Sequence, residues 1–271
     1  MHTLIAGAGG PLGRELVDRF LRLDWRVTAL AYSIKKFTGW IHPRLTLRAG
    51  NVTRPYQIEG LCQGVDVVLS CIGITRMGNH QMTHHEVDYL GNLNLLREAE
   101  RAGVRKFAFV TPVGAERGAQ RGIPLLDAKY QFKNELRRSS LEWLIFRSGA
   151  FYPDLAEWGR MAGSGPLAII GPGTHYSTPI DVGELATLMA NDLPEHRNEV
   201  IEYGGPENLS WNDIGQIFRE QLGRPTRVRH IPIGLCRTLL PLIKPFSHAY
   251  HAQGQLILFM FTHDLPTPHR G

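Results

Sequence analysis

The chain has 271 residues, of which 43% are apolar and 20% are charged, and a formal net charge of +5. This balance is typical of a globular protein that is long enough to bury a large core without disulfide or metal staples. The lysines and arginines form no run of five or more, so the positive charge does not predict nucleic-acid binding.

The spacing of the cysteines and the length of the apolar runs predict the cellular compartment in which the protein is found. Cys62, Cys71 and Cys236 lie far apart, which argues against a disulfide framework and favours a reducing, cytoplasmic location. The first apolar run is broken by glycines from Gly7 onwards, unlike a signal peptide. No apolar stretch is long enough to predict an integral membrane span. The histidines follow no recognisable ligand pattern, so no metal site is predicted.

The first half of the chain alternates short apolar runs with helical periodicity. We expect strands at 2–6, 26–31, 45–48, 65–71, 106–110 and 143–146, and helices at 12–23, 84–102 and 127–139. The core stripe of the second helix is expected to contain Val87, Leu90, Leu93, Leu96 and Ala99. Such alternation predicts an α/β fold, namely a Rossmann-type doubly wound parallel sheet with helices on both faces.

The pattern changes after about residue 150. Residues 151–179 are rich in glycine and proline and predict a loop that lines a cleft. Further on we expect a helix at 182–191, a strand at 199–203, a helix capped by Ser210 with Asp213, a strand at 227–231, and C-terminal helices broken by Pro241 and Pro245.

These patterns suggest two unequal parts. We expect an NAD(P)-binding Rossmann domain over 1–150 and a smaller substrate or lid lobe over 151–271, with 179–203 free to return to the main sheet. The many apolar residues of 235–261 predict a core or lid pair of helices. An exposed apolar face that docks on a membrane or a partner is the alternative.

A glycine-rich loop lies between the first predicted strand and the first helix. Gly7, Gly10 and Gly13 form GxxGxxG within Gly7-Ala8-Gly9-Gly10-Pro11-Leu12-Gly13. The first glycine permits a sharp turn, the second lets backbone N–H groups approach a pyrophosphate, and the third lets the helix pack close to the strand. The anion then lies at the positive end of the helix. In its strand–turn–helix context the motif predicts dinucleotide binding.

The residues after the second predicted strand indicate which dinucleotide is bound. A carboxylate there would bind the ribose hydroxyls of NAD, but the sequence has Tyr32-Ser33-Ile34-Lys35-Lys36 and no acidic residue nearby. Lysines and a hydroxyl suit a 2′-phosphate. NADP(H) is therefore favoured, and NAD(H) is the second option. The alternative is that these residues form a solvated basic loop that binds no ligand.

Longer motifs extend over nearly the whole chain. They are GAGGPLG from Gly7, VDVVLSCIG from Val65, VDYLGNLNLLREAERAGVRKFAFVT from Val87, KYQFKNELRRSSLEWLIFRSG from Lys129, PIDVGELA from Pro179 and GGPENLSWNDIGQIFREQLGRPTRVRHIPI from Gly204. Together they resemble an atypical short-chain dehydrogenase/reductase of the NmrA-like branch, which also contains the nucleotide-binding accessory subunit of respiratory complex I. These motifs are more specific for the family than for a reaction.

The resemblance implies roles for particular residues. The loop from Gly7 to Gly13, with Gly9, Gly10, Pro11 and Leu12, would hold the pyrophosphate, and Ser33 and Lys36, beside Tyr32, would meet the 2′-phosphate. Asn51 and Val52 would flank the adenine, and Cys71, Ile72 and Gly73 would pass beside the ribose. Lys129 would bind the nicotinamide ribose, with Thr111 and the segment from Ser148 and Gly149 to Tyr152 close to the nicotinamide.

The chain departs from the family pattern at the catalytic tyrosine. Active short-chain dehydrogenases use Tyr-x-x-x-Lys, in which the lysine lowers the pKa of the tyrosine so that it can donate a proton. Leu125 stands four residues before Lys129, and Tyr130 directly follows the lysine and points elsewhere on a helix. Thr111-Pro112-Val113 stands where a serine is usual. The acid would then be Lys129 or Tyr152, or there is no turnover.

Two functions of different classes remain open. The first is an NADP(H)-dependent oxidoreductase that reduces a small, largely apolar carbonyl, enone or quinone-like substrate, as a monomer or homodimer. The second is a non-catalytic cofactor-binding protein, either a redox sensor or a structural subunit. Lys129 favours the first, and Leu125 favours the second.

Overall fold

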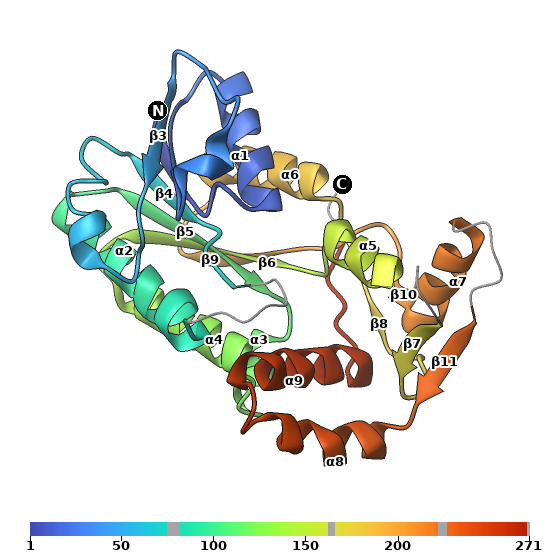
Figure 1. Cartoon of the computed structure of the whole chain (residues 1–271). Helices are drawn as coiled ribbons and strands as arrows, with labels where there is room; N and C mark the ends of the chain where they lie inside the picture. The colour runs from blue at the N-terminus through green and yellow to red at the C-terminus, as the bar shows by residue number, and fades with distance from the viewer. Residues whose placement is uncertain (75–81, 162–165, 222–226, 270–271) are drawn as a thin grey trace.

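A parallel sheet of seven strands forms the centre of the molecule, which is seen in a computed structural model that describes residues 1–74, 82–161, 166–221 and 227–269 (Figure 1). The strands, in spatial order, are β3 (Leu45–Ala49), β2 (Arg26–Ala31), β1 (His2–Ala6), β4 (Val67–Ser70), β5 (Lys106–Pro112), β6 (Glu142–Ser148) and β9 (Glu199–Tyr203). The order reverses direction between β1 and β4, which is where doubly wound folds bind their ligands. The predicted Rossmann-type sheet is confirmed.

The central strands β1, β4 and β5 are buried almost throughout, as expected where helices cover both faces of a sheet, whereas the edge strands β3 and β9 are partly exposed. The strand register brings three strand ends together, since Ala6 pairs with Leu30 on one side and with Ser70 on the other. The loops that follow β1, β2 and β4 therefore begin at the same edge of the sheet.

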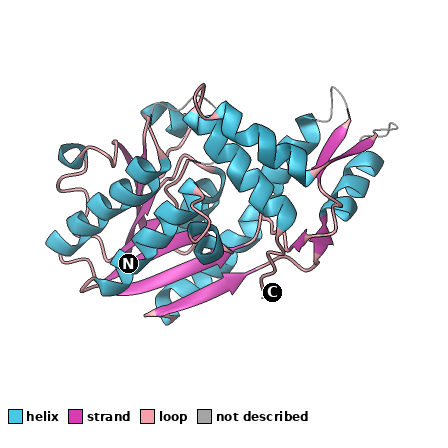
Figure 2. Cartoon of the chain, turned by 90° about the horizontal axis from the view of Figure 1, so that it is seen from below, coloured by secondary structure: helices cyan, strands magenta, loops and turns pink. Residues whose placement is uncertain are grey.

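Two helical layers flank the sheet (Figures 1 and 2). One face is covered by α1 (Pro11–Arg22) and α6 (Val182–Glu195), which bury Leu16, Val17, Phe20, Leu185, Met189 and Leu193. The other is covered by α2 (Asn92–Arg101) and α4 (Pro124–Arg138), which bury Leu95, Leu96, Ala99, Phe132 and Leu136. The short helix α3 (Ala115–Ala119) precedes α4.

The helix predicted at 84–102 is divided in the structure. Its first part, η3 (His85–Gly91), is a π-helix, and α2 continues from it. The wider turn shifts the residues after it around the helix. As a result Leu90 is 38% exposed and Leu95 is fully buried, so the predicted stripe is wrong at Leu90 and misses Leu95.

The segment predicted as a loop at 151–179 contains a helix and two short strands. These are α5 (Tyr152–Met161), β7 (Leu167–Ile170) and β8 (Tyr176–Ser177), and β7 and β8 pair with β11 (Val228–Ile231) and β10 (Leu209–Ser210). Leu155 and Trp158 lie one turn apart on α5 and pack in a cluster with Trp211, the first residue of α7 (Trp211–Gln221). This tertiary packing stabilises a helix that local composition does not favour.

The C-terminal helices differ in burial. In α9 (His248–Thr262), Phe259 and Phe261 are buried, whereas α8 (Ile233–Ile243) has no buried residue and leaves Leu242 61% exposed. Of the predicted core or lid pair, α9 therefore contributes to the core and α8 lies on the surface, and a lid role for either helix stays a prediction. β9 and α6, which belong to the second half of the chain, pack with the main sheet. The division into two parts near residue 150 remains a proposal.

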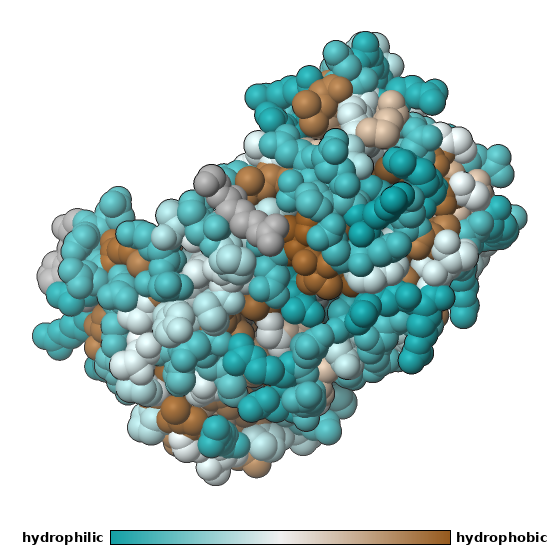
Figure 3. Space-filling view, turned by 180° about the vertical axis from the view of Figure 1, so that it is seen from behind, coloured by the Kyte–Doolittle hydropathy of each residue, from teal (hydrophilic) through white to brown (hydrophobic). Residues whose placement is uncertain are grey.

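The face opposite to that of Figure 1 is largely hydrophilic, with apolar residues gathered in smaller patches (Figure 3). Across 1–74, 82–161, 166–221 and 227–269, no helix combines the length and apolar character that a membrane span requires. Nor do three His, Cys, Asp or Glu side chains come together in these ranges as metal ligands would.

Candidate cofactor and active site

The glycine loop joins β1 to α1 at the edge where the strand ends meet. Gly7 has a φ of 86°, and its N–H donates to the Leu30 carbonyl, so the chain turns sharply after β1. A Cβ on Gly13 would lie 2.3 Å from the Gly7 carbonyl oxygen, so only glycine lets the helix start so close to the loop. Within the described chain, a Cβ on Gly10 would meet only that same oxygen, at 3.4 Å. The space in front of Gly10 is open.

The first turn of α1 is suited to an anion. Gly10 is the N-cap, and Pro11 and Leu12 follow it without a capping side chain or an acidic residue in the first turn. The N–H groups and the positive end of the helix dipole are therefore free for a phosphate. Gly9 lies against the basic loop, since a Cβ there would be 3.0 Å from the Cβ of Lys36. This cradle fits a pyrophosphate.

Two lysines follow β2, and an arginine of α1 contacts the same loop. Ser33 begins the short helix η1 (Ile34–Phe37) and accepts a hydrogen bond from the Lys35 N–H at 3.4 Å. Lys35 and Lys36 are exposed, and Arg14 of α1 donates to the Lys36 carbonyl at 2.5 Å. Sequence reasoning missed Arg14, although its place directly after the third glycine is a usable signal. The three charges suit a 2′-phosphate.

An open recess of about 630 Å³ lies beside this basic loop. The Asn51 N–H donates to the Gln57 side chain at 2.9 Å, which fixes the loop that leads into η2 (Pro55–Gln57). Val52 is buried and packs into the core. Of the predicted residues, Tyr32, Ser33 and Asn51 line the recess, together with Arg54, Tyr56 and Gln57.

The chain after β4 passes directly under the glycine loop. A Cβ on Gly7 would lie 2.8 Å from the Cys71 carbonyl oxygen, and one on Gly73 would lie 2.7 Å from Asp88 Oδ1. Burial raises the pKa of the Cys71 thiol to about 12, although the charge of Lys129 acts in the opposite direction. Cys71 is therefore a neutral thiol at physiological pH and is not activated as a nucleophile.

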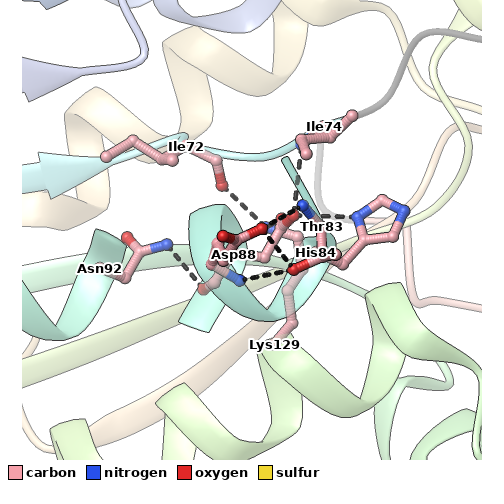
Figure 4. Close-up of polar contacts among 8 residues, drawn as sticks. Ile72, Ile74, Thr83, His84, Asp88, Asn92 and Lys129 are labelled. Atoms are coloured by element: carbon pink, nitrogen blue, oxygen red, sulfur yellow. Dashed lines mark hydrogen bonds and ion pairs between the residues drawn. The ribbon is translucent and has the colours of Figure 1, made fainter. Parts of the chain in front are cut away.

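Lys129 lies at the centre of a buried polar chain (Figure 4). Its Nζ donates to the Ile72 carbonyl at 3.0 Å and lies 3.2 Å from Asp88 Oδ1. The other oxygen of the fully buried Asp88 contacts His84 Nδ1 at 3.0 Å and accepts the Ile74 N–H at 3.3 Å. Sequence reasoning missed Asp88 and His84, whose spacing of four residues places them on one helix face.

The predicted residues at the ends of β5 and β6 are buried. Thr111 is 1% exposed, and its hydroxyl has no hydrogen-bond partner in the described part of the chain. A buried hydroxyl without a partner is costly, so this position fits a polar group supplied by a ligand. Ser148 is buried and pairs with Pro112, the residue after Thr111, and a Cβ on Gly149 would lie 2.3 Å from the Thr178 carbonyl oxygen.

Tyr152 lies at the start of α5 and is 40% exposed. Burial raises the pKa of its phenol, and the negative charges of Glu184, Glu207 and Asp181 raise it further. A cation that activates a tyrosine shifts the pKa the other way. The surroundings of Tyr152 therefore make it a weaker acid than an ordinary tyrosine.

Leu125 occupies the place of the missing tyrosine and is buried in an apolar cluster. It packs with Leu126 on α4 and with Phe259 and Leu265 from the C-terminal region. The contact with α9 explains why this position is apolar. No hydroxyl is available there to donate a proton.

A pocket of about 320 Å³ lies between α9, the start of η3, the start of α4 and Lys244 of the α8–α9 connection. His84 lines it and joins it through Asp88 to Lys129. Its lining combines apolar side chains such as Ile74 and Met82 with polar ones, and small-molecule sites use both kinds of group. The pocket is therefore the candidate substrate site.

Comparisons with known proteins agree with this geometry. The family model described as NAD(P)H-binding matches residues 7–166. Among curated relatives, the photosystem II assembly factor Ycf39 of Synechocystis sp. is 24% identical over 94% of this chain and 78% of that protein. The chloroplastic divinyl chlorophyllide a 8-vinyl-reductase of Arabidopsis thaliana is 25% identical over 96% of this chain and 66% of that protein.

Solved structures share the fold at low identity. A nucleoside-diphosphate-sugar epimerase from Staphylococcus aureus has a TM-score of 0.74 at 15% identity, over 97% of this chain and 89% of that one. DesIV, a dTDP-glucose 4,6-dehydratase from Streptomyces venezuelae solved with NAD, has a TM-score of 0.73 at 18% identity, over 100% and 88%. The chain therefore belongs to the NAD(P)H-binding family.

Proposed function

We propose that this protein is an NADP(H)-dependent reductase of a small, largely apolar carbonyl, enone or quinone-like compound. The observation that carries the proposal is the buried chain from Lys129 through Asp88 to His84, which connects the end of β4 to the 320 Å³ pocket. Burying charged groups costs free energy unless each one has a close partner of opposite charge. Buried charged groups are therefore often found at functional sites.

The residues around the strand ends would hold the cofactor. The loop from Gly7 to Gly13 would bind the pyrophosphate, Lys36 and Ser33 the 2′-phosphate, and Lys129 the nicotinamide ribose hydroxyls. Thr111 and Ser148 would lie at the nicotinamide end. When bound, the reduced nicotinamide supplies a hydride, and the protein supplies orientation and a proton.

Two groups of the buried chain can supply that proton. Lys129 is the candidate from the sequence. His84 is a second candidate, which we infer from the structure because Asp88 contacts its Nδ1 and its side chain lines the pocket. The carboxylate holds the imidazole in one orientation, an arrangement in which histidine can act as a general acid.

The proposal is tested by a screen for NADPH oxidation with the purified full chain. Enones, quinones and aldehydes are supplied one at a time, and absorbance is compared with a sample that lacks the test compound. We expect at least one class to be reduced well above background. The reductase proposal fails if none is reduced while NADPH still binds tightly.

A second proposal is NADP(H) over NAD(H), based on Arg14, Lys35 and Lys36. Lys36→Ala removes a charge-assisted contact, worth about 1.5–3 kcal/mol. We expect NADPH affinity to fall about 10- to 150-fold while NADH affinity changes little. Calorimetric titration measures both, and Arg22→Ala, at the far end of α1, is the control. Equal or tighter binding of NADH by the unaltered chain contradicts the preference.

A non-catalytic cofactor-binding protein is the second candidate function. Leu125 favours it, because that position is filled by apolar packing with α9 and carries no hydroxyl. The relatives include both classes of protein, since one is named an assembly factor and another a reductase. Tight NADPH binding without oxidation in the screen is the result that this alternative predicts.

A further inference from the structure

The candidate substrate pocket is basic on one side. Lys244, in the α8–α9 connection, and His248 and His251, on α9, line it, and His84 lines it from η3. The residues described as lining the pocket include no aspartate or glutamate. The neighbouring carboxylates are already bound, since Glu86 accepts hydrogen bonds from Thr83 and Asp88 contacts both Lys129 and His84.

The basic side chains have no counter-ion in the described parts of the chain. Neither Lys244 nor His248 nor His251 forms an ion pair with a described residue. Burial lowers the pKa of His251, and the positive charges of Lys244 and His248 lower it further. An anion placed among them would relieve this repulsion.

Five apolar residues of the lining can hold a hydrocarbon body, alongside the neutral polar side chains of Thr83, Tyr250, Gln253 and Gln255. Ile74 and Met82 line the pocket from the end of β4 and the approach to η3, Pro124 from α4, and Ala249 and Ala252 from α9. Burial of apolar ligand surface against such side chains provides the affinity, while a few polar groups set the orientation.

We propose that the pocket binds an apolar organic acid, with its carboxylate near Lys244, His248 and His251 and its hydrocarbon body against the apolar lining. This inference rests on the proposed function in one respect, since it names the class of substrate that the reductase would take. Bound in this way, the molecule would extend toward His84, next to the buried chain that ends at Lys129.

The test uses binding alone and needs no turnover. The probes are two fluorescent dyes with the same aromatic skeleton, the anionic 1-anilinonaphthalene-8-sulfonate and the neutral N-phenyl-1-naphthylamine. Both are titrated into the full chain and into a Lys244→Gln/His251→Gln variant. Arg237→Gln is the matched control, because it removes a charge from the exposed α8 without touching the pocket lining. Leu239→Gln tests whether the dye binds to the outer face of α8 instead.

We expect the chain to bind the anionic dye more tightly than the neutral dye, and the double variant to weaken it at least about tenfold. The neutral dye should be unaffected, and so should both dyes in the two α8 variants. Affinity for the anionic dye should also rise as the pH falls below 6.5, the ordinary histidine value from which burial lowers the pKa of His251, because that imidazole then gains a proton. The charged groups that act on His251 are Lys244 and His248.

Equal affinity for both dyes, an unchanged anionic preference in the double variant, or a loss caused by Leu239→Gln would each overturn the proposal. A negative NADPH-oxidation screen would remove the reductase but would leave this binding result standing. The two failures are therefore distinguishable.

Discussion

Lys129→Met is expected to lower the rate of NADPH-dependent reduction about 10²- to 10⁴-fold, the range for loss of a general acid. The methionine keeps an apolar stem but removes the charge and all three N–H donors. Cofactor affinity should fall much less than turnover. Steady-state kinetics on any substrate from the screen, together with calorimetric NADPH titration, separates the two effects.

The same change leaves the fully buried Asp88 without its cation, which typically costs about 3–5 kcal/mol of stability. The matched control is therefore Asp88→Asn/Lys129→Met, which removes both charges and should restore the melting temperature without restoring turnover. Recovery of activity in this double variant would mean that Lys129 stabilises the fold and has no part in the chemistry. If activity survives in both variants, His84→Gln and Tyr152→Phe are the next changes to measure.

Gly10→Val is expected to abolish cofactor binding while the chain remains folded. A Cβ at this position meets one described atom, the Gly7 carbonyl oxygen at 3.4 Å, so a branched side chain would enter the open space where a pyrophosphate must approach. Calorimetric titration with NADPH and NADH measures the loss. Circular dichroism before and during heating measures the fold.

Gly234→Val is the matched control, because a Cβ on Gly234 has no described atom within 4 Å and the residue lies on the exposed α8. It should bind cofactor normally. A folded Gly10→Val protein with unchanged affinity would refute the placement of the pyrophosphate. Gly13→Val is unsuitable for this purpose, since its Cβ would lie 2.3 Å from the Gly7 carbonyl oxygen and would disrupt the loop itself.

Local sequence patterns alone determined the central sheet and the place of the cofactor loop. Parallel strands buried on both faces are continuous apolar runs, so β1, β4 and β5 are recognisable without knowledge of their neighbours. The glycine motif lies between one strand and one helix, and its geometry depends on short-range contacts such as that of Gly13 with Gly7. The capped start of α7 is similarly local, since Ser210 and Asp213 exchange hydrogen bonds across three residues.

Only the tertiary structure decided what surrounds Lys129. The π-turn of η3 changes the helix register, and it brings Asp88 under Gly73 and beside a lysine that is distant in the sequence. The apolar character of Leu125 is explained by α9, which lies more than a hundred residues further along the chain. The pocket also depends on α9, whose histidines face the start of η3. Contacts between distant segments leave no periodic pattern in the sequence, because each side chain meets its partner only after the layers have packed.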